Sequence, residues 1–229
     1  HLVDCVLNFT GERSQDLRIL RSHKNRFGTT SEIGAFEMAE EGLIEVPNLS
    51  ESFLEGMDLA LEGAAVTAVY EGTRPLLLEI QALAAPANVG FARRTAIGVD
   101  NTRLNMILAV LDRKAGISLI NHDIYVNIVG GLRPEDTSID LAVAMAVYSA
   151  YKRIPIDPKT LFLGEIGLTG ELRTIKNADK IIKEAARMGF TRVLMPQRNA
   201  AKLAEKGSDI PRSIKIIGVR SLYEAISHI

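Results

Sequence analysis

The sequence predicts an α+β (mixed α/β) fold, because β-rich apolar runs alternate with helical patterns along 229 residues. The strongest observation is residues 138–151, predicted as a helix without a charge between Asp140 and Lys152. A helix that is apolar on every face is either a membrane span or a buried core helix. This one has about half of the ~20 residues that a span needs. We therefore expect a core helix with the sheet and outer helices around it.

Composition limits the class of protein. A hydrophobic content of 47% suffices for one sizeable core and a smaller second unit. The single Cys5 rules out an internal disulfide and is predicted to be a buried thiol. The four scattered histidines form no ligand spacing with Cys5, so no metal site is expected. Without a signal peptide or a spanning segment, we expect a cytoplasmic protein that has no membrane partner.

Charge and pattern divide the chain near residue 58. Residues 1–60 carry 5 Lys+Arg against 11 Asp+Glu, whereas residues 61–229 carry 22 against 17. Residues 1–58 hold too few apolar residues for an independent core, and we predict them to be the last strands of a domain that begins before His1. Residues 59–229 are predicted to form a second domain. Its positive charge suits an anionic partner, and a solvated surface of mixed charge is the alternative.

The elements follow from periodicity and punctuation. Strands are predicted at residues 2–9, 17–20, 33–38, 43–46, 64–70, 76–83, 117–120, 124–129, 160–166, 192–195 and 214–219. Helices are predicted at residues 50–56 behind a Ser50 cap, 102–115 behind Asn101, 138–151, 178–188 behind Asn177, 200–206, and after a capping box of Ser221 and Glu224. Loops are predicted at residues 21–34, 82–100 and 130–140.

Two cations stand out in the first of these loops. Lys24 and Arg26 lie two residues apart in the sequence Lys-Asn-Arg-Phe-Gly, which ends at Gly28. Such a pair on a glycine-ended loop can place two positive charges near one anion. An ordinary solvated turn is the alternative interpretation.

Two stretches resemble a known family. The Lys-Asn-Arg-Phe-Gly motif, with the apolar runs around it, resembles the end of the ATPase domain in the bacterial RadA/Sms DNA-repair family. Residues 164–173 (GEIGLTGELR), with residues 126–133 and 92–111, resemble the domain that this family shares with the proteolytic part of Lon. The resemblance spans essentially the whole chain. It implies that residues 1–58 end a RecA-like ATPase domain and that residues 59–229 form a Lon protease-like domain.

The resemblance also implies an activity. Members of the family act as ATP-driven hexameric motors that extend branched recombination intermediates. The implied partners are therefore single-stranded and branched DNA, the RecA recombinase and further copies of the chain. Lys24 and Arg26 would then be trans fingers that reach the nucleotide of a neighbouring subunit, with Asn25, Phe27 and Gly28 completing the motif. The full-length protein would use ATP and Mg, with zinc only in an N-terminal finger. This chain contains no P-loop, so no cofactor is expected in it alone.

Ser138 aligns with the nucleophilic serine of Lon, which requires a lysine as its base. Counting from residue 164 places Asp179 at the lysine position, and Lys180 follows one residue later. One residue on a helix turns a side chain by ~100°. Asp140 replaces a glycine of the Lon pattern, so we predict that Ser138 caps a helix. A Lon-type Ser/Lys peptidase and a purely structural oligomerisation module remain the alternative functions.

Several cations of the second domain are candidate phosphate contacts. Aromatic residues make up only 5% of the chain and do not interleave with them, so binding should be electrostatic and tolerant of sequence. The alternative for any single arginine is a surface ion pair. The candidates are Arg93, Arg94, Arg103, Arg133, Arg173, Lys176 and Lys180. The segments around Arg93 and Arg173 are predicted to line one face of a ring.

Overall fold

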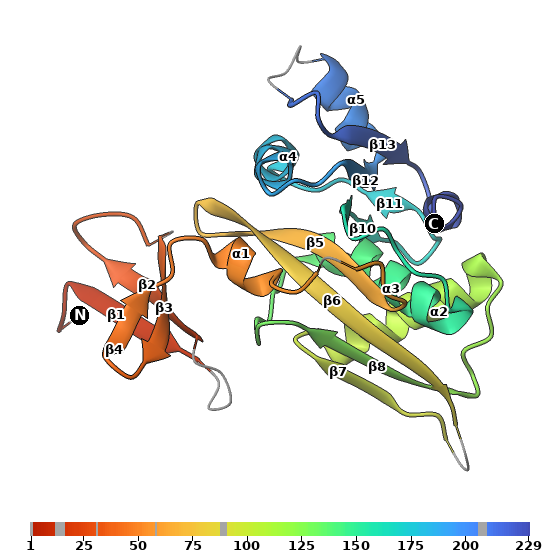
Figure 1. Ribbon diagram of the computed structural model, residues 1–229, viewed down its shortest axis with the longest axis horizontal. Coiled ribbons are helices and arrows are strands. Elements are labelled where there is room, and N and C mark those ends of the chain that lie inside the picture. Colours follow the sequence, from red (N-terminus) through yellow and green to blue (C-terminus); the bar gives the residue numbers. More distant parts are fainter. Residues whose placement is uncertain (1, 12–16, 31, 58, 88–90, 206–209) are drawn as a thin grey trace.

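A computed structural model describes residues 2–11, 17–30, 32–57, 59–87, 91–205 and 210–229. A small N-terminal sheet stands beside a larger unit of sheet and helices (Figure 1). The fold is α+β, as predicted. Among the described residues, no helix is both long enough and apolar enough to cross a membrane.

The N-terminal sheet has four antiparallel strands in chain order. The strands are β1 (Cys5–Thr10), β2 (Leu17–Asn25), β3 (Ile33–Ala39) and β4 (Gly42–Glu45). Every residue of β1 is exposed, so the prediction of a buried Cys5 thiol is wrong. The apolar run around Cys5 forms an edge strand, and apolar character alone does not tell which strand of a sheet is covered.

The larger unit contains a seven-stranded sheet in the order β13-β12-β9-β5-β6-β8-β7. Strand β6 is antiparallel to both of its neighbours, and the other strands share one direction. The strands are β5 (Ala64–Glu71), β6 (Arg74–Pro86), β7 (Arg94–Ile97), β8 (His122–Ile128), β9 (Thr160–Phe162), β12 (Arg192–Pro196) and β13 (Lys215–Val219). A separate ribbon pairs β10 (Glu165–Ile166) with β11 (Leu172–Arg173).

Helices cover both faces of this sheet. Side chains along a strand alternate between the faces, and in the central strands both faces carry apolar side chains. Val193 and Met195 of β12 belong to one buried cluster, and Leu194 between them belongs to the other. Helices α2 (Asn101–Ala115), α3 (Asp140–Lys152) and α6 (Leu222–Ile226) cover the Leu194 face, and α4 (Ala178–Arg187) and α5 (Gln197–Glu205) cover the other. Helix α1 (Leu49–Phe53) lies against β6, where the Leu77 N–H donates to Ser50 Oγ at 3.1 Å.

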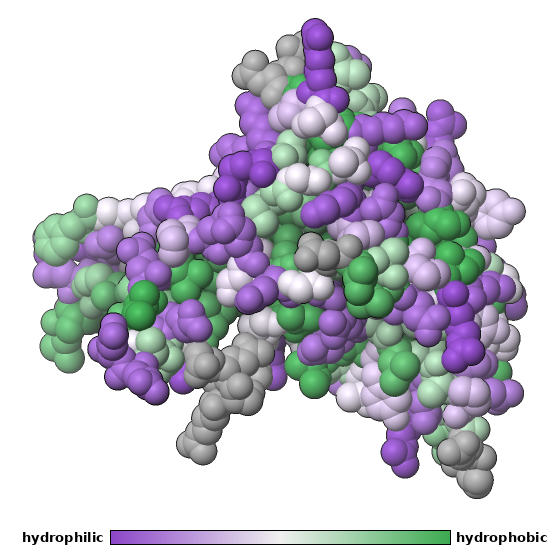
Figure 2. Space-filling view, in the orientation of Figure 1, coloured by the Kyte–Doolittle hydropathy of each residue, from purple (hydrophilic) through white to green (hydrophobic). Residues whose placement is uncertain are grey.

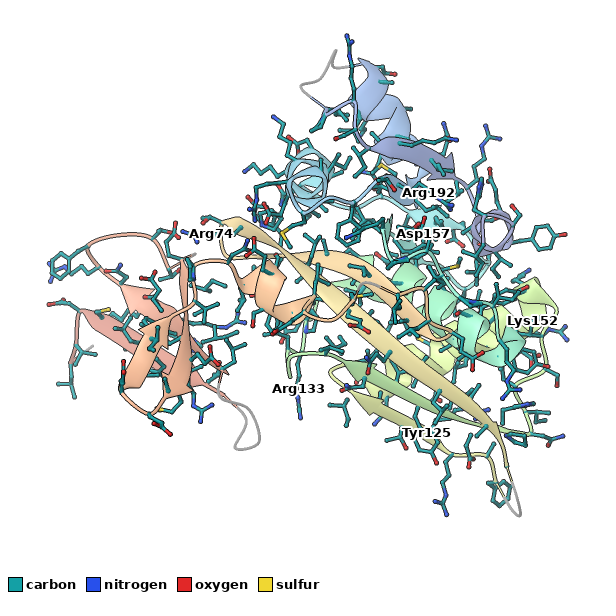
Figure 3. All side chains as sticks on the ribbon, viewed as in Figure 1. Arg74, Tyr125, Arg133, Lys152, Asp157 and Arg192 are labelled. Carbon is teal, nitrogen blue, oxygen red and sulfur yellow. The ribbon has the colours of Figure 1, made fainter. Side chains whose placement is uncertain are left out.

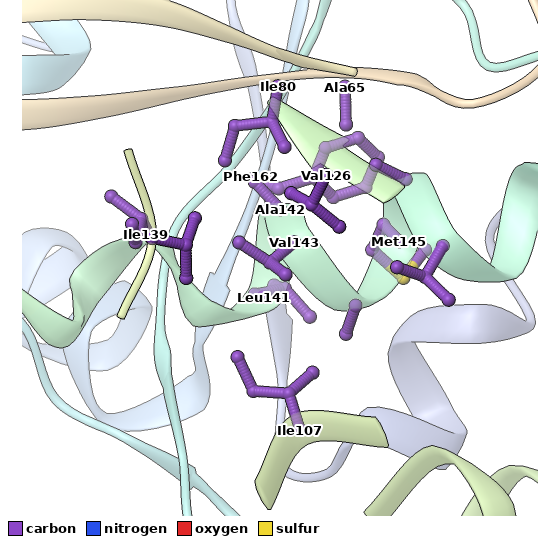
Figure 4. Packing of buried hydrophobic residues seen from close by; sticks show 14 of the residues in the cluster. Ala65, Ile80, Ile107, Val126, Ile139, Leu141, Ala142, Val143, Met145 and Phe162 are labelled. Atoms are coloured by element: carbon purple, nitrogen blue, oxygen red, sulfur yellow. The ribbon is translucent and has the colours of Figure 1, made fainter. Parts of the chain in front are cut away.

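Helix α3 is the predicted core helix. Its residues 140–147 are all buried, and a short 3₁₀ turn, η1 (Thr137–Ile139), leads into it. Figure 4 shows Ile80, Val126 and Phe162 on one side of the helix and Ile107 on the other. The sheet and α2 therefore enclose α3 between them, which explains why no charge is tolerated along its middle.

Three local predictions are wrong because other side chains make the hydrogen bonds that were expected from strand neighbours or from the predicted caps. Residues 117–120 form no strand, since Asp112 accepts from the Leu119 N–H at 3.3 Å and Arg94 donates to the Leu119 carbonyl at 2.7 Å. Asp100, and not Asn101, caps α2 by accepting from the Arg103 N–H at 2.8 Å. Asn48 caps α1 in place of the buried Ser50.

Two predicted segments have different boundaries. The single strand predicted at residues 160–166 is divided at Gly164, whose φ of +153° turns the chain from β9 into the separate ribbon. The loop predicted at residues 82–100 is shorter, since β6 runs to Pro86 and β7 begins at Arg94. The Ser221 cap is confirmed, and its Oγ accepts from the Glu224 N–H at 3.2 Å.

The enclosure of α3 leads to a stability prediction. Leu141→Ala removes a side chain that is fully buried in α3, so we expect a loss of ~2–5 kcal/mol in the free energy of unfolding. Leu168→Ala is the matched control, because Leu168 is 65% exposed and should change stability by no more than about 0.5 kcal/mol. Urea denaturation followed by circular dichroism measures both, and equal losses would contradict the central place of α3.

Candidate functional sites

The first candidate site is the end of β2. The strand continues to Asn25, so Lys24 lies on a paired strand and not in the predicted loop. Its register with β1 shifts at this point, because Val6 pairs with Lys24 while Leu7 pairs with Ser22. His23 is therefore the extra residue of a β-bulge. A bulge redirects the side chains that follow it, and here the first of these belongs to Lys24.

The turn after β2 explains the other residues of the motif. Asn25 Oδ1 accepts from the Phe27 N–H at 3.0 Å, and Asn25 Nδ2 donates to the Thr29 carbonyl at 3.3 Å. A Cβ at Gly28 would lie only 3.2 Å from Asn25 Nδ2, so a larger residue would crowd this turn. Phe27 is 81% exposed, which makes its ring available to another surface.

The two cations of the motif converge on the start of β1. Lys24 Nζ donates to the Val3 carbonyl, and Arg26 Nη1 lies 3.1 Å from Asp4 Oδ1. The Arg26 and Asp4 side chains are 72% and 54% exposed, and such surface pairs contribute little to stability. The structure thus brings Lys24 and Arg26 to one place, where the Asp4 carboxylate occupies the position of an anion.

The second candidate site is the position that resembles the Lon nucleophile. Ser138 is buried, and among the described residues its Oγ has no hydrogen-bond partner. The prediction that Ser138 caps the helix is wrong, because Asp136 Oδ1 accepts from the Ser138 N–H at 2.9 Å. Asp179 and Lys180 are exposed on α4, and Lys180 Nζ donates instead to the Tyr70 hydroxyl at 3.1 Å. The structure does not bring these residues together as a nucleophile and its base.

A buried ion pair lies next to this position. Arg103 donates to both carboxylate oxygens of Asp140, with Nε 3.0 Å from Oδ1, and also to the Ile166 carbonyl at 3.0 Å. The Ile166 N–H donates in turn to Asp140 Oδ2 at 3.0 Å. Arg103 was a candidate DNA contact, but its guanidinium is engaged within the protein. We leave it out of the proposed DNA surface.

Burial dominates the electrostatics of this pair. It raises the pKa of Asp140, although the hydrogen bonds from Arg103 and from the Ile166 N–H act in the opposite direction. The hydrogen bond to Asp140 raises the pKa of Arg103. Arg103 therefore stabilises the charged form of Asp140, but this attraction does not fully compensate for removing the carboxylate from water. This is the usual balance for buried ion pairs.

The third candidate site is the surface of cations, and its arginines near β7 differ in environment. Arg94 is half-buried and donates to the carbonyls of Leu119 and His122, and burial lowers its pKa while Asp123 raises it. Arg93 keeps an exposed side chain, although its backbone N–H donates to Asp123 Oδ1 at 2.7 Å. Strand β8 brings the Asp123 carboxylate to this segment, so its positive charge is partly offset.

The cations of α4 form a row that the sequence prediction only partly included. Lys180, Lys183 and Arg187 are exposed and follow the spacing of one helix face, and Lys176 precedes them. This i, i+3, i+7 spacing was visible in the sequence and would have added Lys183 and Arg187 to the candidates. We call residues 176, 180, 183 and 187 the α4 row. Arg187 also lies 2.7 Å from Glu184, so the row is partly neutralised.

The two predicted DNA segments lie far apart within one chain. Arg94 begins β7 at one edge of the seven-stranded sheet. Arg173 lies near the opposite edge, where the Leu172 N–H donates to the Arg220 carbonyl just beyond the end of β13. Six strand spacings amount to roughly 30 Å, so these segments occupy opposite corners (Figure 1). A shared face would require an assembly, and that remains a prediction.

The remaining candidates are also on the surface. Arg133 is exposed and lines a cavity of about 520 Å³ together with Arg103 and Asp136. Figure 3 shows Arg133 on the loop below β6, away from α4. Within the described ranges, no three His, Cys, Asp or Glu side chains are grouped so that they could hold a metal ion.

The comparisons with known proteins identify the family. The family described as subunit ChlI of Mg-chelatase matches residues 83–199, more than half of the chain, and the chain therefore belongs to this family. Along its whole length the chain is similar to proteins named DNA repair protein RadA. The one from Halalkalibacterium halodurans is 46% identical over 99% of this chain and 48% of its own length.

Two further relatives carry the same name. The protein from Bacillus subtilis is 45% identical over 99% of this chain and 48% of its own length, and that from Streptococcus pneumoniae is 44% identical over 100% and 53%. The chain spans about half the length of these relatives. The predicted RadA/Sms relationship is confirmed.

The buried pair leads to a pH-dependent prediction. Arg103→Ala leaves the Asp140 carboxylate buried without its partner, which should cost ~3–5 kcal/mol near neutral pH. Loss of Arg103 raises the folded-state pKa of Asp140 further above its unfolded value of about 4. The variant should therefore be most stable below the unfolded pKa of Asp140 and lose stability as the pH rises through the folded-state pKa. Urea denaturation between pH 4 and 8 measures this. The control Arg103→Ala/Asp140→Asn should show a much weaker dependence, and equal slopes would contradict the assignment.

Proposed function

We propose that the chain is the C-terminal part of a DNA-dependent ATPase of recombinational DNA repair. The observation that carries the proposal is the match of RadA DNA-repair proteins to 99–100% of the chain. In this proposal residues 1–58 end a RecA-like ATPase domain, and residues 59–229 form a non-proteolytic Lon-like domain that assembles a ring and binds DNA. ATP and Mg would be held by a part of the protein that precedes this sequence.

The convergence of Lys24 and Arg26 supports a function as trans fingers. Arg26 pairs with the exposed carboxylate of Asp4, and Lys24 bonds the carbonyl of the preceding residue, Val3. A phosphate of a neighbouring subunit's nucleotide carries more charge than a carboxylate and would take its place. The exposed Phe27 ring would pack on that neighbour and fix the direction of the turn.

The surface of the N-terminal sheet supports its place in a larger domain. Leu7, Phe9 and Ile44 are 59%, 50% and 49% exposed, and apolar residues gather over this sheet in Figure 2. Isolated sheets do not leave such surface in water without a partner. Further elements of a RecA-like domain would cover it.

Ring assembly is supported by an open face of the large sheet. On the α4 side, the ends of β6, β8 and β7 form a shallow cavity of about 380 Å³. Leu61, Leu83 and Ile97 line it at 52%, 60% and 49% exposure, and Glu62 is its one acidic lining residue among those described. A surface with three exposed aliphatic side chains and a single charge fits a neighbouring subunit, and we propose a hexamer.

The exposed cations support DNA binding without sequence preference. Arg93, Arg173 and the α4 row offer exposed positive charge, which suits phosphate contacts with single-stranded and branched DNA. We propose RecA as the protein partner on that DNA. The peptidase alternative is not favoured, because Ser138 is buried and Lys180 is bonded to Tyr70.

The finger proposal is tested in the full-length protein. Arg26→Ala and Lys24→Ala should leave ATP binding nearly unchanged but lower DNA-stimulated hydrolysis by ~10³-fold, because a finger acts on the charge of the transition state. Asp4→Asn, which removes only the resident anion, is the matched control and should keep the parent rate or exceed it. Steady-state ATPase assays and nucleotide titration measure both, and parent-like hydrolysis by Arg26→Ala would remove the finger role.

The DNA surface is tested by salt dependence. Each phosphate contact that is lost should reduce the slope of log K against log salt by ~0.9 on duplex DNA and ~0.7 on single strands. We expect this for Arg93→Ala and for Lys176→Ala, with uniform weakening across sequences. Lys152→Ala, an exposed cation at the end of α3, is the control. If both variants bind as tightly as the parent at ~0.1 M salt, the DNA surface lies elsewhere.

A further inference from the structure

The turn between β5 and β6, residues 71–74, contacts both units of the chain. Glu71 Oε2 accepts from Arg21 Nη1 of β2 at 2.7 Å, and Thr73 Oγ1 donates to Glu32 Oε1 at 3.1 Å. A cavity of about 360 Å³ at this junction is lined by the small sheet, the turn and α4. Figure 3 shows Arg74 at this meeting point. The turn therefore joins the N-terminal sheet to the larger unit through side chains.

The same turn is tied to the α4 row on its other side. The Tyr70 hydroxyl donates to the Thr73 carbonyl at 2.7 Å and accepts from Lys180 Nζ at 3.1 Å. The Lys180 ammonium also lies 5.3 Å from the centre of the Tyr70 ring, a distance at which a cation is attracted to the ring. A DNA phosphate would compete with Tyr70 for this ammonium group.

We propose that Arg21 is a positioning residue for the fingers: its ion pair with Glu71 holds β2 against the β5–β6 turn and so sets the place of Lys24 and Arg26. This inference rests on the proposed finger function. It adds a route by which the α4 row affects hydrolysis, since Lys180 bonds Tyr70, the residue before Glu71.

The geometry of β2 makes Arg21 suited to this task. Arg21 pairs with Asn8 of β1 on one side and Ile33 of β3 on the other, so this part of the strand is held in a ladder. Lys24 follows three residues later, roughly 10 Å along the strand. The His23 bulge lies between them and determines the direction of Lys24, so a displacement of Arg21 alters how β2 enters this bulge. Misplacing a catalytic group by about 1 Å can cost ~10²-fold in rate.

The environment of the pair supports a specific contact. The Arg21 and Glu71 side chains are 35% and 17% exposed, in contrast to the much more exposed pair of Arg26 and Asp4. Partial burial reduces screening by salt, so this pair holds its geometry better than a surface pair. The pair is a polar contact at a junction where Ile19 of β2 is also buried in the larger core, so removing the pair leaves that apolar packing in place.

The experiment uses the full-length protein and a charge reversal. Arg21→Glu and Glu71→Arg should each lower the DNA-stimulated kcat by ~10-fold, while the KM for ATP and the affinity for DNA stay unchanged. The double variant Arg21→Glu/Glu71→Arg should recover most of the lost kcat. The kcat of the conservative variant Arg21→Lys should lie between that of the parent and that of Arg21→Glu. Thermal unfolding identifies any variant that fails to fold, and Arg21→Lys then carries the test.

Three outcomes separate the possibilities. Parent-like kcat in both single variants overturns the inference. A loss that the double variant does not recover also overturns it, because the pairing is then not the cause. If Arg26→Ala itself keeps the parent rate, the finger proposal fails independently of Arg21.

Discussion

Helix α3 is buried on every face along residues 140–147, and the rest of the larger unit is arranged around it to keep water away. The sheet encloses one side of the helix and α2 the other. The charge at its first residue, Asp140, must then be neutralised inside the protein, and Arg103 from α2 does so while also bonding the Ile166 carbonyl. One buried carboxylate thus ties together the core helix, its cover and the β10–β11 ribbon.

This arrangement supports the proposal that the position resembling the Lon nucleophile is not proteolytic. Ser138 is drawn into the buried entrance of α3, and Asp136 takes over the capping of its backbone. The cations that might have reached it serve other contacts, since Lys180 turns to Tyr70 and Arg103 to Asp140. The polar groups around Ser138 thus serve contacts between elements of the protein.

The cations proposed to contact DNA are few and widely spread, in a chain whose formal net charge is −1. Long-range attraction to DNA is accordingly weak for one copy. Repetition around a ring would multiply each small cluster without requiring more charge per subunit. The same logic applies to the fingers, because Lys24 and Arg26 gain a nucleotide to act on only when a neighbour brings one. Both proposed activities therefore depend on assembly.

The sequence by itself determined the fold class, the buried helix, the order of the units, the family and the paired cations of the Lys-Asn-Arg-Phe-Gly motif. These features depend on local patterns: the spacing of apolar and polar residues and the positions of glycine. Such patterns can be read from neighbouring residues alone. Tertiary structure alone decided the partners of the charges. Arg103 meets Asp140 across 37 residues and Arg21 meets Glu71 across 50. It also exposed Cys5, turned the guanidinium of Arg94 to the Leu119 carbonyl and, among the described residues, left the buried Ser138 Oγ without a hydrogen-bond partner. The sequence specifies which side chain is charged or apolar, but not its surroundings. Only the packing of distant segments determines whether that side chain faces water, a carboxylate or a carbonyl.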